Sequence, residues 1–440
     1  MLRYYICIVI SFFFFSSCFF QQKVVKNEQM ENKVPIPEKK EEILVERLPD
    51  SPSETKVGES KHAEQKRDTL PVVISPQTKI PNSDKIKPIR HQPFKVVVAL
   101  PLDGSYGVNR FAEFVNGLLI ANQISNSDVL NKIKIDVVNI GNQNTELELE
   151  QFEPIKKANL LIGGYQTSQI KALSTIALSK KIPFISLWNT SEDIVQDNPL
   201  YIQLKPSLIA YCNAISDYIS HNIRPALAII LLESRDSKDV VTSSAFESMY
   251  TFQHTPYKVM YGSDIIDWKV IFDANSSVVV NIPNWDNKSF VFSALKQIIE
   301  AKKDKNVFVT GMPQWMSWDQ VDFSVYEKVN LIIPYFNNVS TGLITTEIFN
   351  KHYFDKNGTW PTAESYYGFD VFQMIKKEGL INFEGESLNP ALDLSGQYLS
   401  YYKIMPSMKS DIEGNSKLSY FQNVYLTIQK FEGGRFVPVQ

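Results

Sequence analysis

The chain has 440 residues, of which 44% are hydrophobic and 12% aromatic, so it can form the core of one large domain or two medium ones. A formal net charge of −3 gives no electrostatic basis for binding nucleic acid, which requires a basic face. Cys7 and Cys18 lie in the leader, which leaves Cys212 in the folded part, and no C-x-x-C or H-E-x-x-H spacing occurs. We therefore expect no internal disulfide, no metal site and no cofactor.

The first 18 residues, MLRYYICIVISFFFFSSC, are typical of a secretory leader. Arg3 precedes an apolar segment from about Tyr4 to Phe15, which is too short to span a bilayer. Phe15–Cys18 resembles the lipobox of bacterial lipoproteins, with Phe in place of the usual Leu. The resemblance implies a lipid on Cys18 that anchors the protein to a membrane. The alternative is an ordinary cleaved signal peptide with an incidental cysteine.

Residues 19–93 are expected to form a disordered linker. From Gln21 to Pro93 there is no Phe, Tyr or Trp, while there are nine prolines, fourteen Lys or Arg and twelve Asp or Glu. So little apolar surface cannot offset the entropy lost on folding. A flexible chain of this length reaches about 45–50 Å at roughly 5–6 Å × √n, so the segment can serve as a tether.

The folded part opens with a predicted strand at Val96–Leu100, an apolar run expected to be buried on both faces. The loop Asp103–Gly107 carries two glycines. From Arg110 to Asn122 the apolar period changes from two to about 3.6, which predicts a helix. A strand, loop and helix form the first half of a βαβ unit, and loops at the carboxyl ends of such strands line the ligand crevice of open α/β sheets.

The alternation of strands and helices continues at intervals of about 25–30 residues, which predicts parallel sheets covered by helices on both faces. Further strands are predicted at 132–139, 158–165, 183–188, 225–231, 278–283 and 307–311, and further helices at 168–179 and 288–301.

Four segments, in the order VVVALPLDG, NLLIGGYQTS, KIPFISLWNTSED and NPLYIQLKPS, are similar to the first lobe of type I periplasmic binding proteins. The branched-chain amino-acid receptors of ABC transporters belong to that family. Glu364–Val371 resembles the family's helix with a Tyr-Gly-Tyr-Asp-type motif. The resemblance extends over most of residues 94–436 and implies an α/β fold with two Rossmann-like lobes.

The resemblance also implies how the chain is divided between the lobes. The first lobe would hold about 94–205 and 338–388, and the second about 206–335 and 392–440. The chain would cross between the lobes three times, near Gln203–Ile209, Pro334–Val339 and Glu386–Ser395. Proteins of this architecture bind ligands between the lobes and close about a hinge.

In the family, backbone N–H groups and hydroxyls at helix N-termini hold the ligand's carboxylate, because these donors are unpaired and the helix dipole favours an anion. The residues in the matching loops are Ser105, Tyr106, Gln166, Thr167, Ser168, Asn189, Thr190 and Ser191. The hydroxyls among them suit a carboxylate. They equally suit helix N-capping, for which Ser and Thr are favoured.

The family holds the ligand's ammonium group with an acidic residue of the second lobe. Asp286 is the nearby carboxylate that could take this role, and it could instead be the N-cap of the helix predicted at 288–301. Trp315 and Trp318 could supply apolar surface to a ligand or pack in the core. The sequence thus predicts side chains that can donate hydrogen bonds to a ligand's carboxylate. It gives weaker support for an acidic side chain that would bind the ligand's ammonium group.

The sequence favours a binding protein over an enzyme. It has no G-x-S-x-G elbow and no P-loop, and His221, His254 and His352 are isolated. The main hypothesis is a lipid-anchored solute-binding protein that delivers an amino acid or amide-like molecule to an ABC permease. The alternative is an envelope scaffold or regulator that contacts a peptidoglycan synthase, similar to penicillin-binding-protein activators, and the long tether favours it. Phe19–Gln22 contains no acidic residue, which favours a periplasm-facing location in the bacterial envelope.

Overall fold

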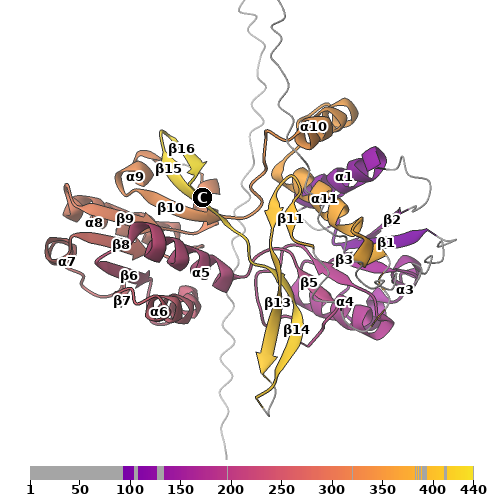
Figure 1. Ribbon diagram of the computed structural model, residues 1–440, viewed down its shortest axis with the longest axis horizontal. Helices are drawn as coiled ribbons and strands as arrows, with labels where there is room; N and C mark the ends of the chain where they lie inside the picture. Colours follow the sequence, from indigo (N-terminus) through magenta and orange to yellow (C-terminus); the bar gives the residue numbers. More distant parts are fainter. Residues whose placement is uncertain are drawn as a thin grey trace, which may run out of the picture. The chain divides into compact units, whose positions relative to one another are not determined.

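The computed structural model describes residues 93–103, 108–125, 133–195, 197–319, 321–381, 383, 385, 388, 394–410 and 414–439 (Figure 1). All of them belong to one unit, Asp84–Gln440. The leader, the linker and Cys18 lie outside the described residues, and so do Ser105 and Tyr106 of the first predicted ligand loop. Within the described part, no helix has the length and apolar character needed to cross a membrane.

The first sheet consists of β1 (Phe94–Leu100), β2 (Ile133–Asn139), β3 (Leu160–Gly163), β4 (Phe184–Ser186), β5 (Tyr201–Gln203), β13 (Ile404–Ser410) and β14 (Ser416–Asn423). Their order across the sheet is β13-β14-β5-β4-β3-β1-β2. The strands from β2 to β5 are parallel to their neighbours. The β13–β14 hairpin is antiparallel, and its strand β14 runs parallel to β5.

Alternate residues of β1 face opposite layers of helices, which explains why its apolar run has no polar interruption. Val96, Val98 and Leu100 pack on one face and Val97 and Ala99 on the other, and all five are fully buried. The first face is covered by α1 (Val108–Ser125), α10 (Ile344–Asn357) and α11 (Ala363–Ile375). The second face is covered by α2 (Glu146–Leu149), α3 (Glu153–Lys156) and α4 (Thr167–Lys180).

The second sheet consists of β6 (Leu227–Leu232), β7 (Tyr257–Tyr261), β8 (Ser277–Asn281), β9 (Asn306–Thr310), β10 (Leu331–Tyr335), β15 (Thr427–Glu432) and β16 (Arg435–Pro438). Their order is β16-β15-β10-β9-β8-β6-β7. The strands from β6 to β10 are parallel, whereas β15 is antiparallel to β10 and forms a hairpin with β16.

Helices also cover both faces of the second sheet. One core lies under α7 (Trp268–Ala274), α8 (Lys288–Lys302) and α9 (Ser324–Lys328). The other lies under α5 (Leu208–Tyr218) and α6 (Ser243–Phe252). The remaining short elements are the π-helix η1 (Ile219–Ile223), the 3-10 helices η2 (Lys238–Thr242) and η3 (Pro313–Ser317), α12 (Glu378–Ile381), β11 (Gly396–Gln397) and β12 (Tyr401–Tyr402).

Each parallel-dominated sheet with its helices forms one lobe, which confirms the predicted α/β fold with two Rossmann-like lobes. The chain crosses between the sheets three times. The first crossing, Leu204–Ser207, joins β5 to α5, and the second, at 336–343, joins β10 to α10. Both lie close to their predicted positions.

The structure places the third crossing elsewhere than the sequence predicted. The prediction near Glu386–Ser395 would assign everything from residue 392 onward to the second lobe. However, β13 and β14 pair within the first sheet, so the chain returns to the second sheet only at Val424–Leu426. The resemblance gave no signal for a hairpin of the first lobe at these residues.

Helices α1 and α11 lie side by side on the first sheet (Figure 1). Glycines allow their backbones to touch. A Cβ atom added at Gly117 would lie 1.9 Å from the carbonyl oxygen of Ser365, and one added at Gly368 would lie 2.1 Å from that of Phe114. This packing brings together the N-terminal turns of the two helices, which carry Arg110 and Glu364.

Candidate functional site

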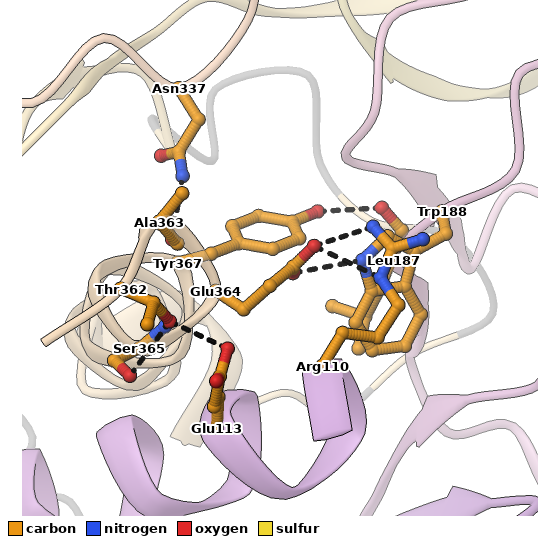
Figure 2. A network of polar contacts seen from close by, with 10 residues as sticks. All are labelled: Arg110, Glu113, Leu187, Trp188, Asn337, Thr362, Ala363, Glu364, Ser365 and Tyr367. Atoms are coloured by element: carbon orange, nitrogen blue, oxygen red, sulfur yellow. Dashed lines mark hydrogen bonds and ion pairs between the residues drawn. The ribbon is translucent and has the colours of Figure 1, made fainter. Parts of the chain in front are cut away.

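Arg110, Glu364 and Trp188 form a polar cluster where α1, α11 and the loop after β4 meet (Figure 2). The guanidinium of Arg110 donates to Glu364 Oε1, with an Nε–Oε1 distance of 3.0 Å, and forms an ion pair with the same carboxylate. Trp188 Nε1 donates to Glu364 Oε2 at 3.1 Å, and the Arg110 guanidinium lies 5.2 Å from the centre of the Trp188 ring. Both carboxylate oxygens of Glu364 are therefore engaged within the protein.

The first turn of α11 is fixed by further hydrogen bonds. Thr362 caps the helix by accepting from the backbone N–H of Ser365, and its hydroxyl donates to Glu113 Oε2 at 2.7 Å (Figure 2). The hydroxyl of Tyr367 donates to the carbonyl of Leu187 at 2.8 Å. A negative charge in the first turn of a helix is also favoured by the helix dipole, so Glu364 is stabilised where it stands.

A cavity of about 540 Å³, including space open to solvent, lies against this cluster. The first lobe contributes residues of the cluster, and the second lobe contributes Tyr211 from α5 and Tyr335 from β10. Residues of the first two crossings, Lys205, Phe336 and Asn337, complete much of its wall. The cavity therefore lies where the chain passes between lobes, the position at which a ligand can contact both.

A second cavity, of about 560 Å³ measured in the same way, shares three residues with the first: Lys205, Tyr211 and Pro313. Its other lining residues are Thr190, Leu208, Trp285, Met312 and Gln314. The two cavities are thus adjacent, and each falls in the size range of small-molecule sites. We call them the crossing site.

Lys205 and Arg110 are the cations that line the crossing site, and Arg110 is paired with Glu364. Among the described residues, no acceptor lies within hydrogen-bond or ion-pair distance of the Lys205 ammonium group, although the side chain is largely buried. Burial lowers the pKa of Lys205, the positive charge of Arg110 lowers it further, and the carboxylate of Glu364 opposes both effects. A buried charge without a partner is costly, so an anion bound here would be favoured by the lysine.

Two phenols and a hydroxyl accompany this lysine. Burial raises the pKa of Tyr211, and burial together with the Glu364 charge raises the pKa of Tyr335, so both phenols are neutral at physiological pH. In the described part of the chain, neither phenol nor the Thr190 hydroxyl has a hydrogen-bond partner. Lys205 and Tyr211 thus present donors to both cavities, while Tyr335 adds a hydroxyl to the first cavity and Thr190 adds one to the second.

Thr190 is the predicted ligand residue that lines the crossing site. Its neighbour Asn189 is buried and donates to Ser191 O, Tyr201 Oη and Gln203 Oε1 at 2.9–3.2 Å, so it holds the loop in shape. Ser191 is exposed, and its hydroxyl accepts from the N–H of Asp193.

Gln166, Thr167 and Ser168 lie at the exposed start of α4 and line neither cavity. The buried residue that organises this turn is Gln169. Its Oε1 accepts from the backbone N–H groups of Tyr165 and Gln166, and its Nε2 donates to the carbonyl of Gly141. The N-cap of α4 is Gln166, so neither the Thr167 nor the Ser168 hydroxyl has the capping role that the sequence offered as an alternative to ligand binding.

The two predicted residues of the second lobe also lie outside the two cavities. Asp286 is exposed and forms an ion pair with Lys238 at 2.7 Å, and the N-cap of α8 is its neighbour Asn287. Trp315 is fully buried, donates from Nε1 to Asn284 O at 2.8 Å and stacks on Trp318. Its role in the structure is core packing.

Sequence reasoning missed Lys205, Tyr211, Tyr335 and Trp285. Trp285 lies in the loop that was searched for an acidic residue. Lys205 lies in the segment NPLYIQLKPS, whose end was predicted to be a crossing between the lobes. A lysine between Leu204 and Pro206 in such a crossing was the available signal.

No protein-family model matches the chain, and no curated protein matches it. Solved structures match with probability 1.00. A substrate-binding protein of an ABC transporter from Desulfitobacterium hafniense is 14% identical with a TM-score of 0.53, and the match covers 79% of this chain and 100% of that one. Its structure in complex with Leu is 15% identical with a TM-score of 0.50, with the same coverage.

A structure from Rhodospirillum rubrum, described as a branched-chain amino acid ABC transporter, is 11% identical with a TM-score of 0.55, and the match covers 79% of this chain and 100% of that one. At these identities the likeness concerns the fold. The fold of this chain is that of the type I periplasmic binding proteins, as the order of its sequence segments predicted.

Proposed function

We propose that the chain is the solute-binding protein of an ABC transporter and captures a small polar molecule in the crossing site. The observation that carries this proposal is the set of donors around Lys205, none of which has a partner within the described chain. Donors that line a cavity and are not paired within the protein are available to a ligand, which favours a binding role. The resemblance to transport receptors supports the same function, and no catalytic step is needed for it.

Ligand-dependent stabilisation tests this proposal. At a concentration one hundred times Kd, a ligand stabilises its protein by about 2.7 kcal/mol, which for a folded part of this size raises Tm by about 4 °C. We expect such a shift from at least one member of a panel of organic acids, amino acids, amides and short peptides. A flat response across the panel at millimolar concentration would count against a receptor.

A single hydroxyl can locate the response. Tyr211→Phe removes one neutral donor from the crossing site and should weaken binding of the ligand found by about fivefold, the effect of one hydrogen bond of about 1 kcal/mol. Tyr218→Phe is the matched control, because Tyr218 lies on the same helix α5 and lines neither cavity. Equal effects of the two changes would place the ligand elsewhere.

A second candidate is a scaffold or regulator of a peptidoglycan synthase, anchored by a lipid on Cys18. The predicted linker 19–93 favours it, because a receptor beside its permease needs less reach than about 45–50 Å. Co-purification with membrane synthases that survives Tyr211→Phe, together with a flat ligand panel, would favour the scaffold. In both cases we propose a location in the bacterial envelope, facing the periplasm.

A further inference from the structure

We propose that the crossing site takes a monocarboxylate with an uncharged apolar tail and without an α-ammonium group. This inference rests on the proposed function and names the class of ligand. Three observations support it. Hydrogen-bond donors line the site, the nearby acidic groups are paired within the protein, and apolar side chains lie beside the lysine.

The donors favour an anion of small size. Lys205 supplies the charge, and it lines both cavities together with Tyr211. A carboxylate has two oxygens and about four acceptor positions, which matches an ammonium and the hydroxyls of Tyr211, Tyr335 and Thr190 in number. Hydrogen bonds to charged groups are about twice as strong as neutral ones, so Lys205 should provide the main anchor.

The acidic groups around the site cannot readily receive an ammonium group. Glu364 is the carboxylate among the residues lining the two cavities, and Arg110 and Trp188 already occupy both its oxygens. An ammonium beside Lys205 would also be repelled by a like charge. An α-amino acid would therefore place its ammonium group in the site without an anionic partner, which is unfavourable.

Acidic residues further along the second lobe are engaged as well. Glu233 accepts from the side-chain amides of Asn284 and Asn287 at 3.0 and 2.7 Å. Asp239 accepts from Asn284 at 3.1 Å and from the backbone N–H of Glu233 at 3.1 Å. These bonds hold the loop that carries Trp285, so both carboxylates serve the wall of the site rather than a ligand.

Apolar side chains form part of the wall next to the lysine, beside the polar Thr190 and Gln314. Leu208, Trp285, Met312 and Pro313 line the second cavity beside Lys205 and Tyr211. An indole ring and a thioether both pack well on an aromatic ring. A carboxylate held by Lys205 would leave its tail against this surface, which selects an aromatic or branched aliphatic tail.

Four probes that share one tail test the inference with the purified full chain: 3-phenylpropanoate, phenylalanine, 2-phenylethylamine and 3-phenylpropanamide. By isothermal titration calorimetry we expect 3-phenylpropanoate to bind at least about tenfold more tightly than each of the others, as expected for one charge-assisted hydrogen bond. Inorganic phosphate, an anion without a tail, should bind more weakly than 3-phenylpropanoate.

A substitution at the lysine tests the role of its charge. Lys205→Met keeps the length of the side chain and removes the charge, so the acid should lose about tenfold or more in affinity while the amide is nearly unaffected. A general loss of structure would instead weaken both probes. Lys171→Met, on the exposed face of α4, is the control and should change neither affinity.

The outcomes separate this inference from the proposed function. Tighter binding of phenylalanine or 2-phenylethylamine would overturn the ligand class and leave a receptor intact. So would binding of phosphate as tight as that of 3-phenylpropanoate, or an unchanged affinity of Lys205→Met for the acid. If only other members of the wider panel bind, the ligand class is likewise overturned and the proposed receptor function stands. If no probe and no member of the panel binds, both proposals fall.

Discussion

Asp370 is a buried acidic side chain on α11. Its hydrogen bonds connect this helix to the segment Leu399–Tyr402, which includes β12. The two oxygens of Asp370 accept from the backbone N–H groups of Leu399 and Ser400 at 2.7 and 3.0 Å, and from the hydroxyl of Tyr402 at 3.2 Å. The Ser400 hydroxyl donates to Asn337 Oδ1, in the second crossing, and the Tyr402 hydroxyl oxygen lies 3.3 Å from the same atom. The carboxylate thus stabilises a network that reaches the wall of the crossing site.

Asp370→Asn should destabilise the protein by about 2 kcal/mol, because the amide nitrogen cannot accept a hydrogen bond and would leave a buried N–H group unpaired. Denaturant unfolding at pH 4 measures this loss, because the buried carboxyl is uncharged below its raised pKa and no cost of ionisation offsets the lost hydrogen bond. Asp355→Asn, on the exposed side of α10, is the matched control and should stay within about 0.5 kcal/mol of the unmodified protein. Equal stabilities of the two variants would contradict the role of Asp370.

The same carboxyl group should make stability depend on pH. Burial raises the pKa of Asp370 to about 7, against an ordinary value of 3.8. Between these values the folded protein holds a proton that the unfolded chain has lost, so the free energy of unfolding falls as pH rises from about 4 to 7 and then levels off. Asp370→Asn should lack this part of the slope, and Asp355→Asn should keep it.

At the level of single residues, the sequence predicted hydrogen-bond donors for the site but identified few of the residues that line the two cavities. Thr190 was found because it follows a strand in a matching loop. Lys205, Tyr211 and Tyr335 were missed because they lie far apart in the sequence. One is in a crossing, one on α5 and one at the end of β10, and these elements come together only through the arrangement of the two lobes. Residue spacing along the chain carries no information about such a meeting.

At the level of elements, the contact between α1 and α11 depends on the absence of side chains. Gly368→Ala would put a Cβ atom 2.1 Å from the carbonyl oxygen of Phe114, so the helices must move apart. We expect a loss of about 2–3 kcal/mol in denaturant unfolding, even though alanine favours a helix. The shift should also disturb Glu364, which lies one turn earlier on α11.

Gly342→Ala is the matched control for this change, because no atom lies within 4 Å of a Cβ added there and its backbone needs no left-handed conformation. It should leave stability within about 0.5 kcal/mol of the unmodified protein. If Gly368→Ala is equally harmless, the two helices do not need their close approach.

Elements whose residues show a clear period were predicted well. The strand predicted at Val96–Leu100 corresponds to β1, because a strand buried on both faces is a continuous apolar run. The helix predicted at 168–179 corresponds to α4, because a helix buried on one face has apolar residues at a period of about 3.6. The β13–β14 hairpin was misplaced for the opposite reason. Much of β13 is exposed, including Met405 and Met408, so the apolar pattern there does not mark a sheet.

At the level of the whole molecule, the proposed anchor makes a prediction about where the protein is found. Cys18→Ala should move it from the membrane fraction to the soluble fraction, because lipid chains gain about 0.8 kcal/mol per buried CH₂ and are then absent. Cys7→Ala, in the apolar part of the same leader, is the control and should leave the protein in the membrane fraction. Retention of Cys18→Ala in the membrane would contradict lipidation at this residue.

The order in which the sheets are completed has a consequence for folding. Strand β14 covers the edge of β5, and β15 covers the edge of β10, although both strands are encoded after residue 415. A chain that emerges from the N-terminus would have two sheets with unpaired edges until its last segment arrives, and open edges invite pairing with other chains. We therefore expect the two lobes to be completed together, once the C-terminal segment has been made, rather than one after the other.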